Sequence, residues 1–215
     1  SAGNADELIN AFSEVVKSIT DRVSSGASAS VNTQELTTGS RLYISGYNTD
    51  GWAGVVTAWD IDPDTATLSA DYAWNAAEKL ETQVGTNGAD HGANRFIATW
   101  DDTAGAGAAF SGDLTSLHSD LTADVVNYLR GDQSLEQQGS GTYRNRMTLW
   151  EGAQEESHFT LGDIIHSSPT FYNDVIYVGA NDGMLHAFLA DDSGNAGKEL
   201  FAYVPGLVQI GRAHV

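Results

Sequence analysis

The last third of the chain holds three short strand patterns separated by turns rich in glycine, asparagine and aspartate. The expected strands are residues 175–179, 184–189 and 199–204, and the turns between them are residues 181–183 and 191–197. Three short strands joined by tight turns predict an antiparallel meander, the unit of a β-propeller blade. A blade needs about 40–45 residues, and a propeller needs several blades. Because a single meander leaves two sheet edges open, we expect the protein to continue well beyond Val215.

The residues before this meander also show strand patterns, with helices inserted between them. Alternating apolar residues predict a hairpin of two strands, 41–47 and 52–61. We expect a short helix after Trp74 and a second helix over residues 121–130. The other expected elements are a glycine-rich loop at 85–94, a strand at 95–100, a mobile low-complexity loop at 104–109 and a polar loop at 133–142. The predicted fold class is therefore mainly β with inserted helices, and residues 28–208 would form the N-terminal part of a propeller.

The two ends of the chain depart from this pattern. Asn4 and Glu7 have the spacing of a helix capping box, and an apolar stripe at helical spacing follows them. We expect residues 1–27 to contain the last helix of a preceding domain, with small polar residues at 24–30 as the linker. Residues 209–215 read Gln-Ile-Gly-Arg-Ala-His-Val, which is what a widely used sequencing adapter encodes, and we expect them to be an artefact.

Charge and composition exclude several kinds of partner. The formal net charge is −19, and the chain has no cysteine. An acidic surface repels phosphate backbones and anionic lipids, so we expect no nucleic-acid binding. The lack of cysteine excludes disulfides and cysteine-type zinc sites. No apolar run is long enough to cross a bilayer, so we do not expect a membrane-spanning chain, and any secretion signal would have to precede Ser1.

Two stretches of the last third closely resemble the PilY family. The members of this family are type IV pilus-associated adhesins and biogenesis factors of bacteria. They read Leu-Gly-Asp-Ile-Ile-His-Ser-Ser-Pro at 161–169 and Val-Ile-Tyr-Val-Gly-Ala-Asn-Asp-Gly-Met-Leu-His-Ala-Phe at 175–188. Shorter pieces that look like the same family lie at 28–32, 52–54, 126–132 and 143–146. The resemblance covers most of the chain. It implies a fragment that leads into the family's C-terminal β-propeller and follows a domain that is often von Willebrand A-like.

The resemblance implies a function in pilus biogenesis and surface adhesion, with the propeller as a binding platform and no enzymatic activity. The partners it implies are pilus or minor pilin components and a surface or host-cell target. The implied location is extracellular or on the bacterial cell surface, at the pilus tip or the outer membrane. Calcium regulates pilus extension and retraction in the family, and we expect the family's calcium loop to lie downstream of this chain.

The same meander also resembles the repeats of quinoprotein dehydrogenases. The similarity rests on residues 181–188 together with Gly-Lys-Glu-Leu-Phe at 197–201. The alternative function is therefore a fragment of a propeller dehydrogenase that uses pyrroloquinoline quinone. This likeness is one of fold, and fold alone does not carry function.

Alternating oxygen-bearing residues suggest a calcium loop near the end of the chain. The candidate ligands are Asp191, Ser193, Asn195, Gly197 and Glu199. Calcium prefers such oxygen-rich loops, but Asp, Ser, Asn and Gly are also ordinary residues of hairpin turns. Only two of the five are carboxylates, which favours a plain turn. Asp60, Asp62 and Asp64 alternate in the same way, but Thr65 stands where an EF-hand loop needs glycine.

The tripeptide Arg130-Gly131-Asp132 has the sequence that integrins recognise on exposed loops. Here it follows an expected helix, where an arginine complements the negative helix end and a glycine provides the left-handed stop. We therefore expect it to be a helix cap.

The remaining polar and aromatic candidates favour structural roles. Three histidines, His158, His166 and His186, lack metal-ligand spacing, and Ser167 and Ser168 lack the nucleophile elbow of a hydrolase. Asp163 and Asp182 could form a carboxylate pair, but short acidic residues more commonly bind backbone amides at turns. We expect the five tryptophans to lie in the core rather than on a sugar-binding surface.

Overall fold

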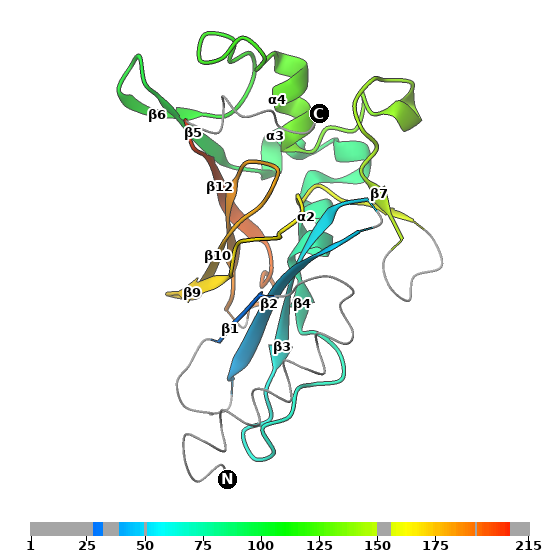
Figure 1. The fold of residues 1–215 in the computed structure, drawn as a ribbon, viewed down its shortest axis with the longest axis vertical. Helices are drawn as coiled ribbons and strands as arrows, with labels where there is room; N and C mark the ends of the chain where they lie inside the picture. Colours follow the sequence, from blue (N-terminus) through cyan, green and yellow to red (C-terminus); the bar gives the residue numbers. More distant parts are fainter. Residues whose placement is uncertain (1–27, 32–38, 50, 150–155, 192, 207–215) are drawn as a thin grey trace.

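The computed structural model describes residues 28–31, 39–49, 51–149, 156–191 and 193–206, which form a mainly β structure with a few short helices (Figure 1). The strands are β1 (Ser28–Val31), β2 (Arg41–Asn48), β3 (Ala53–Asp60), β4 (Trp74–Asn75), β5 (Ile97–Asp101), β6 (Ala106–Ala109), β7 (Met147–Thr148), β8 (Ser157–His158), β9 (Thr170–Tyr172), β10 (Val175–Gly179), β11 (Leu185–Leu189) and β12 (Glu199–Val204). The helices are α2 (Ala76–Val84), α3 (His91–Asn94) and α4 (Ala123–Arg130), with 3-10 turns η1 (Thr86–Gly88) and η2 (Gln137–Gly139). The helix expected within residues 1–27, Trp150 and residues 209–215 lie outside the described residues.

The first sheet has the order β1-β2-β3-β4, and each strand pairs antiparallel with the next along the chain. Its centre is the expected hairpin, in which β2 and β3 pair over eight residues from Arg41–Asp60 to Asn48–Ala53. The strand β1 lies partly in the segment interpreted as a linker, because residues 28–30 pair with β2. The sequence therefore contains a second meander, besides the one expected near its end.

The second sheet has the order β6-β5-β12-β11-β10-β9. The expected meander has four strands instead of three, since β9 pairs with β10 through a turn at Asn173 and Asp174. Both turn residues have positive φ, 49° and 59°, which is the backbone of a two-residue hairpin and a conformation that asparagine and aspartate tolerate. The expectation of a mobile loop at 104–109 is wrong, because β6 lies there and pairs with β5.

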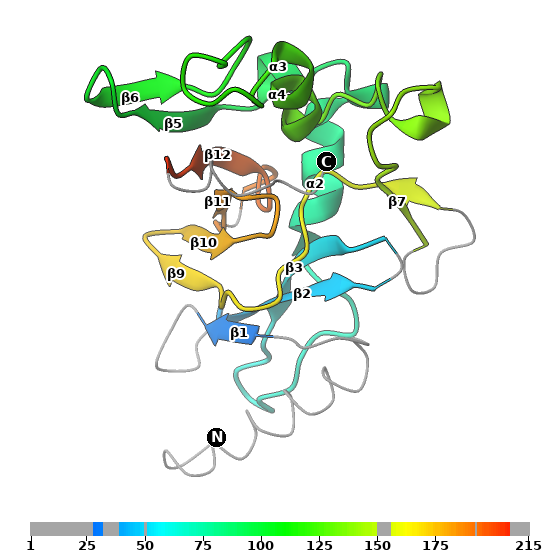
Figure 2. The same ribbon diagram turned by 45° about the horizontal axis from the view of Figure 1, so that its top comes forward.

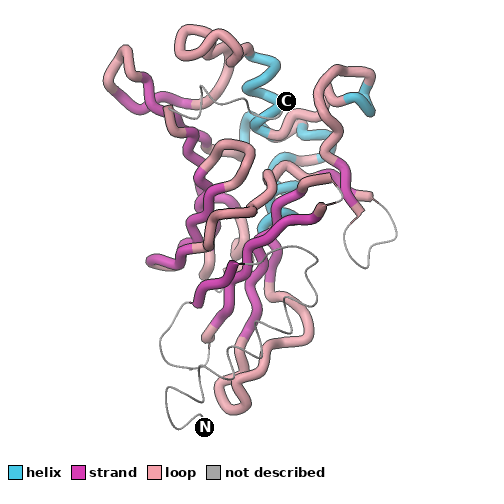
Figure 3. Tube along the Cα trace, in the orientation of Figure 1, coloured by secondary structure: helices cyan, strands magenta, loops and turns pink. Residues whose placement is uncertain are grey.

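Strand β12 also pairs with β5 in parallel, and this joins the meander to the middle of the chain. Figure 2 shows β5 and β6 continuing the sheet of β9–β12 on one side, with the first sheet on the other. Helix α4 and the loops around it lie next to β5 and β6, and most of the regular secondary structure elsewhere is strand (Figure 3).

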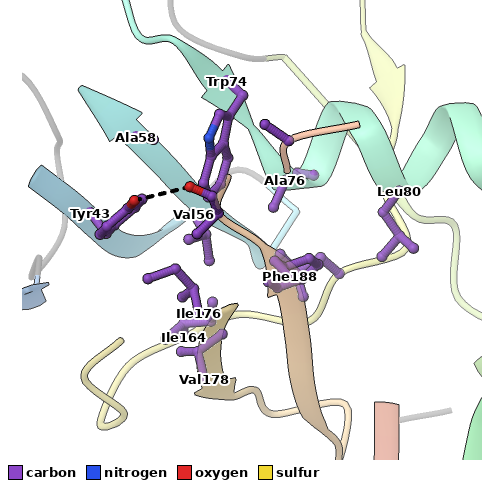
Figure 4. Packing of buried hydrophobic residues seen from close by; sticks show 14 residues of the cluster. Tyr43, Val56, Ala58, Trp74, Ala76, Leu80, Ile164, Ile176, Val178 and Phe188 are labelled. Atoms are coloured by element: carbon purple, nitrogen blue, oxygen red, sulfur yellow. Dashed lines mark hydrogen bonds between the residues drawn. The ribbon is translucent and has the colours of Figure 1, made fainter. Parts of the chain in front are cut away.

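The main apolar core lies between the two meanders (Figure 4). Tyr43 of β2 stacks on Phe171 of β9 at 5.7 Å between ring centroids and lies 5.8 Å from the ring of Trp74. Its hydroxyl donates a hydrogen bond to the carbonyl oxygen of Ala190 at 3.3 Å. Val56, Ile176 and Phe188 are among the other buried members, and burying such side chains stabilises a fold by about 1.5–3 kcal/mol each. The two meanders are therefore packed face to face.

Residues 159–165 run between the two sheets and hold them in register. The amide of Gly54 in β3 donates to the carbonyl of Leu161 at 3.0 Å, and the amide of Gly162 donates to Asp182 Oδ2 at 3.1 Å. A Cβ atom on Gly162 would lie 2.5 Å from the Asp182 amide nitrogen, and one on Gly54 would lie 2.0 Å from the Gly162 carbonyl oxygen. Only glycine permits this close approach, which explains the Leu-Gly-Asp sequence at this point.

The tryptophans divide between the core and the surface. Trp74 is buried, as expected, but Trp52 and Trp100 are 49% and 41% exposed. The expectation that all five lie in the core is therefore wrong for these two. Among the described residues, no helix is both long and apolar enough to cross a membrane.

Candidate functional site

A buried chain of four charged residues lies on the inner face of the second sheet. The guanidinium of Arg95 donates two hydrogen bonds to the carboxylate of Glu199, at 2.7 and 2.8 Å. His186 Nδ1 donates to Glu199 Oε1 at 2.7 Å, and His186 Nε2 donates to Asp182 Oδ2 at 3.0 Å. A carboxylate can only accept, so both ring nitrogens carry protons and the histidine is a cation. The order along the chain is therefore arginine, glutamate, histidinium and aspartate, in which each cation meets an anion.

The ionisation of this network follows from its contacts. Burial alone would lower the pKa of His186, but the charge of Asp182 and the hydrogen bonds to Asp182 and Glu199 raise it to about 9. Burial alone would raise the pKa of Glu199, but the charge of Arg95 and the hydrogen bonds from His186 and Arg95 lower it to about 2. Asp182 also accepts hydrogen bonds from the amides of Gly162 and Met184. The sequence favours a structural role for Asp182, in which it binds backbone amides at a turn. These contacts agree with that role.

A second network repeats the same order of charges beside the short hairpin of β7 and β8. Arg146 Nε donates to Glu136 Oε1 at 2.8 Å, and His158 Nε2 donates to the same oxygen at 3.0 Å. His158 Nδ1 donates to Glu81 Oε2 at 2.8 Å. Burial would lower the pKa of His158, but its hydrogen bonds to Glu136 and Glu81 raise it. The guanidinium of Arg146 also lies 4.0 Å from the ring centroid of Tyr128.

The predicted calcium loop does not bring its five residues together around one point. Asp191 Oδ1 accepts from the amide and hydroxyl of Ser193, at 3.0 and 2.6 Å, and Lys198 Nζ donates to Asn195 Oδ1 at 2.8 Å. Glu199 points inward to Arg95 and His186, and Gly197 has the positive φ of a turn, 83°. In the part of the chain that is described, no group of three or more His, Asp or Glu side chains could hold a metal ion. Calcium binding by this loop stays the untested alternative to the plain turn that the sequence favours.

The other acidic loop and the arginine-glycine-aspartate tripeptide lie in turns. Asp62 Oδ1 accepts from the amides of Thr65 and Asp64, and these bonds lower the pKa of Asp62. Arg130 is buried and donates to the carbonyls of Phe110, His91, Gly92 and Arg95. Gly131 ends α4 in the left-handed conformation. The tripeptide is therefore a helix cap, as expected, and its arginine does not face a partner protein.

The remaining polar candidates are separate from one another. His166 is exposed, and Ser167 Oγ accepts from the amide of Gly179 at 2.9 Å. Asp163 accepts from the side chain of Asn181 at 2.6 Å. Asp163 and Asp182 each have partners of their own, so the structure gives no hydrogen bond between these two carboxylates. The sequence patterns did not indicate Arg95, Glu136 or Arg146, which are buried charged residues of the two networks.

A cavity of about 450 Å³ lies where the two meanders and α4 meet. It is lined by residues from the β2–β3 turn, the end of α4, the approach to β7, the connecting segment 159–165 and the β10–β11 turn. Several of these residues lie in the stretches on which the resemblance to the PilY family rests, at 52–54, 126–132, 143–146, 161–169 and 175–188. The cavity is therefore one place, among the described residues, where a small ligand or a side chain of a partner could enter.

The fold and its buried networks define a mainly β scaffold of two packed meanders. The particular resemblance is to PilY1. A type IV pilus biogenesis factor PilY1 homolog of Xylella fastidiosa is 28% identical over 243 residues, which covers 95% of this chain and 17% of that protein. The type IV pilus biogenesis factor PilY1 of Pseudomonas aeruginosa strain PAK is 29% identical over 264 residues, which covers 97% of this chain and 20% of that protein.

These matches confirm the resemblance inferred from the sequence: the chain is similar to PilY1 proteins over nearly all of its length. The chain spans about a fifth of the length of the curated relatives that it matches. No family model matches the chain, and no solved structure matches it significantly.

Proposed function

We propose that the chain is part of a type IV pilus-associated protein that acts in pilus biogenesis and in surface adhesion. The observation that carries this proposal is the match to PilY1 proteins over at least 95% of the chain. These relatives are named type IV pilus biogenesis factors. The partners would be pilus or minor pilin components and a surface or host-cell target, and the location would be the outside of a bacterial cell.

In this proposal the two meanders are neighbouring blades of a β-propeller that serves as a binding platform. Each consists of four consecutive antiparallel strands, as a propeller blade does. They pack face to face over an apolar core. The opposite face of the second sheet carries Leu185 and Trp100, 39% and 41% exposed, and also the rings of Tyr177 and Phe201, which are in contact with each other. An apolar outer face of this kind suits a further blade packed against it.

The proposal also assigns no enzymatic activity to this part of the protein. The charged groups that are brought together are tied to one another in ion pairs, as scaffold residues are. Calcium, if it is bound by the whole protein, would be bound outside these residues.

The test is genetic complementation in the bacterium that produces the full-length protein. A strain that lacks the gene receives either the complete gene or one without residues 39–206, and surface pili are counted by electron microscopy. We expect few or no pili without this segment, and full restoration with the complete gene. A substitution of an exposed turn residue, Asp64→Asn, is the matched control. Normal pili and normal surface attachment without residues 39–206 would refute the proposal.

An activity assay distinguishes the proposed function from the dehydrogenase alternative. The purified full-length protein is incubated with pyrroloquinoline quinone, calcium, primary alcohols or sugars, and a redox dye. We expect no dye reduction above the level without protein. Turnover that depends on the quinone would replace the proposed function with the enzymatic one.

A further inference from the structure

The cavity between the two meanders contains one arginine whose hydrogen-bonding capacity is largely unused. Arg144 Nη1 donates to the carbonyl of Gly51 at the long distance of 3.4 Å, and its Nε is buried without a hydrogen-bond partner. The guanidinium carbon lies 5.9 Å from the ring centroid of Phe159. A guanidinium has five N–H donors, so this one retains donors for a ligand that enters the cavity.

The other charged groups at the cavity are already neutralised or bound. Arg146 is paired with Glu136 at 2.8 Å, and Asp182 is paired with His186 at 3.0 Å. Asp163 accepts from Asn181 at 2.6 Å and leaves one negative charge at the cavity wall. A doubly charged anion such as phosphate would be repelled by Asp163 and met by only one unpaired cation. A single carboxylate matches both the charge and the planar fork of one guanidinium.

A second polar group supports a ligand with an oxygen or nitrogen atom near this arginine. Thr160 lines the cavity, and its hydroxyl is buried without a hydrogen-bond partner. A buried polar group without a partner is costly in a native protein. A ligand that hydrogen-bonds to both Arg144 and Thr160 would remove this cost.

The remaining lining is apolar and partly aromatic, which requires an apolar body on the ligand. Phe159, Leu161 and Ile165 line the cavity, and so does Trp52, which is 49% exposed. Trp52 has a positive φ of 55° and stacks on Tyr47 at 5.9 Å between ring centroids. A large residue held in this unfavourable backbone conformation is typical of binding sites. The volume of about 450 Å³ is within the range of small-molecule pockets.

We propose that this cavity binds a single carboxylate carried on an apolar, preferably aromatic, body, and that Arg144 and Thr160 hold the carboxylate. Such a group occurs on small carboxylic acids and at the C-terminus of a peptide that ends in an apolar residue. The site does not depend on the proposed pilus function, since it rests only on the geometry of the cavity.

The test is a titration of the full 215-residue chain with two matched pairs of probes, followed by ligand-observed NMR. The first pair is 3-phenylpropionate and its amide, and the second is a tetrapeptide that ends in phenylalanine, with either a free or an amidated C-terminus. We expect each acid to bind about tenfold more tightly than its amide, because the amide lacks the charge that the guanidinium recognises. Tighter binding of the peptide than of the small acid would identify a protein terminus as the ligand, and the reverse order would identify a free acid. Equal binding of acid and amide, or no saturable binding of either acid, would overturn the proposal.

Substitutions of the lining residues test whether the acid binds in this cavity. Arg144→Gln should weaken acid binding about tenfold and abolish the preference for acid over amide, whereas Thr160→Val should weaken it less. Arg41→Gln is the matched control, since Arg41 pairs with Asp60 on the first sheet. Thermal melts of each variant test whether the fold is intact. A preference for acid that survives to the same degree in a folded Arg144→Gln chain would place the carboxylate elsewhere and refute the site.

Discussion

Two regions of the molecule contain the same sequence of charges in different surroundings. In the second sheet, the network runs from Arg95, just before β5, to Glu199 of β12, His186 of β11 and Asp182 of the β10–β11 turn. At the β7–β8 hairpin, the same order is made by Arg146, Glu136, His158 and Glu81. The first lies within a six-stranded sheet, and the second connects helix α2, which carries Glu81, with a two-stranded sheet and the loop before it.

The difference lies in how completely the network is buried and satisfied. The acid at the end of the first network, Asp182, is 13% exposed and also accepts from two backbone amides. The corresponding acid of the second, Glu81, is 22% exposed, and its Oε1 is buried without a hydrogen-bond partner. Charges interact more strongly where water is excluded, and an unpaired charge is also more costly there. The same chemistry should therefore matter more for stability in the sheet than at the hairpin.

Removal of the central glutamate should give the largest effect and the sharpest comparison. Glu199→Gln leaves Arg95 and His186 buried without their shared anion, so we expect a loss of about 3–5 kcal/mol in the free energy of unfolding. Glu136→Gln should cost about 2–3 kcal/mol, because the side chains of its neighbours His158 and Glu81 are 10% and 22% exposed and are therefore partly screened by water. Urea denaturation of the two variants measures both. A larger loss for Glu136→Gln would reverse the comparison.

The terminal acids should differ in the same direction by smaller amounts. Asp182→Asn removes the anion that faces His186, and we expect a loss of about 1–3 kcal/mol. Glu81→Gln should cost about 0.5 kcal/mol, as a partly exposed charge does. Denaturation midpoints under the same conditions check this pair, and equal losses would mean that burial does not separate the two networks.

Stability should fall as the pH rises through the range in which His186 titrates. Its pKa is raised from 6.5 to about 9 in the folded chain. Its contribution is therefore complete below pH 6.5 and lost between 6.5 and about 9. Glu199 acts in the opposite direction, since its pKa is lowered from 4.5 to about 2, and its contribution is lost between 4.5 and about 2. The network should be most stabilising between 4.5 and 6.5.

Thermal melts across this range test the assignment. His186→Gln should flatten the decline of the melting temperature at alkaline pH, and His158→Gln should flatten it less. An unchanged slope in the His186 variant would show that another group is responsible.

Calcium should have the smallest effect, because the candidate loop directs its oxygens at its own backbone and at Lys198. We expect the melting temperature of the chain to differ by less than about 1 °C between millimolar calcium and excess chelator. A clear stabilisation that Asp191→Asn removes would instead place a metal ion in this loop.

Local patterns predicted the strands of the two hairpins and the helix cap well. The β2–β3 hairpin and strands β10 and β12 lie within about a residue of the expected bounds, and Gly131 ends α4 as expected. The short strands β6 and β9 were missed, since β6 is made of alanine and glycine and β9 has only three residues. The Asn-Asp turn before β10 was a usable signal for β9, because both residues tolerate positive φ.

The charged networks could not be predicted from the sequence, because their members come from distant segments. Arg95 and Glu199 are 104 positions apart, and nothing near Arg95 in the sequence indicates a buried partner. The alternate spacing with Asp191 makes Glu199 a candidate ligand of a calcium loop, but its side chain faces inward, toward Arg95. Alternate spacing of polar residues indicates a turn in the backbone. Whether the carboxylates of that turn lie close together depends on tertiary packing.

The parallel pairing of β5 with β12 has a consequence for the order in which the chain can fold. Ile97 pairs with Ala202, so β5 cannot complete its sheet until about a hundred further residues have been synthesised. During that interval Arg95 has no carboxylate from Glu199, and the apolar residues around it have no strand to cover them. Newly made chains should therefore be most vulnerable to proteases and aggregation just before β12 emerges, and the sheet should close late in a single cooperative step.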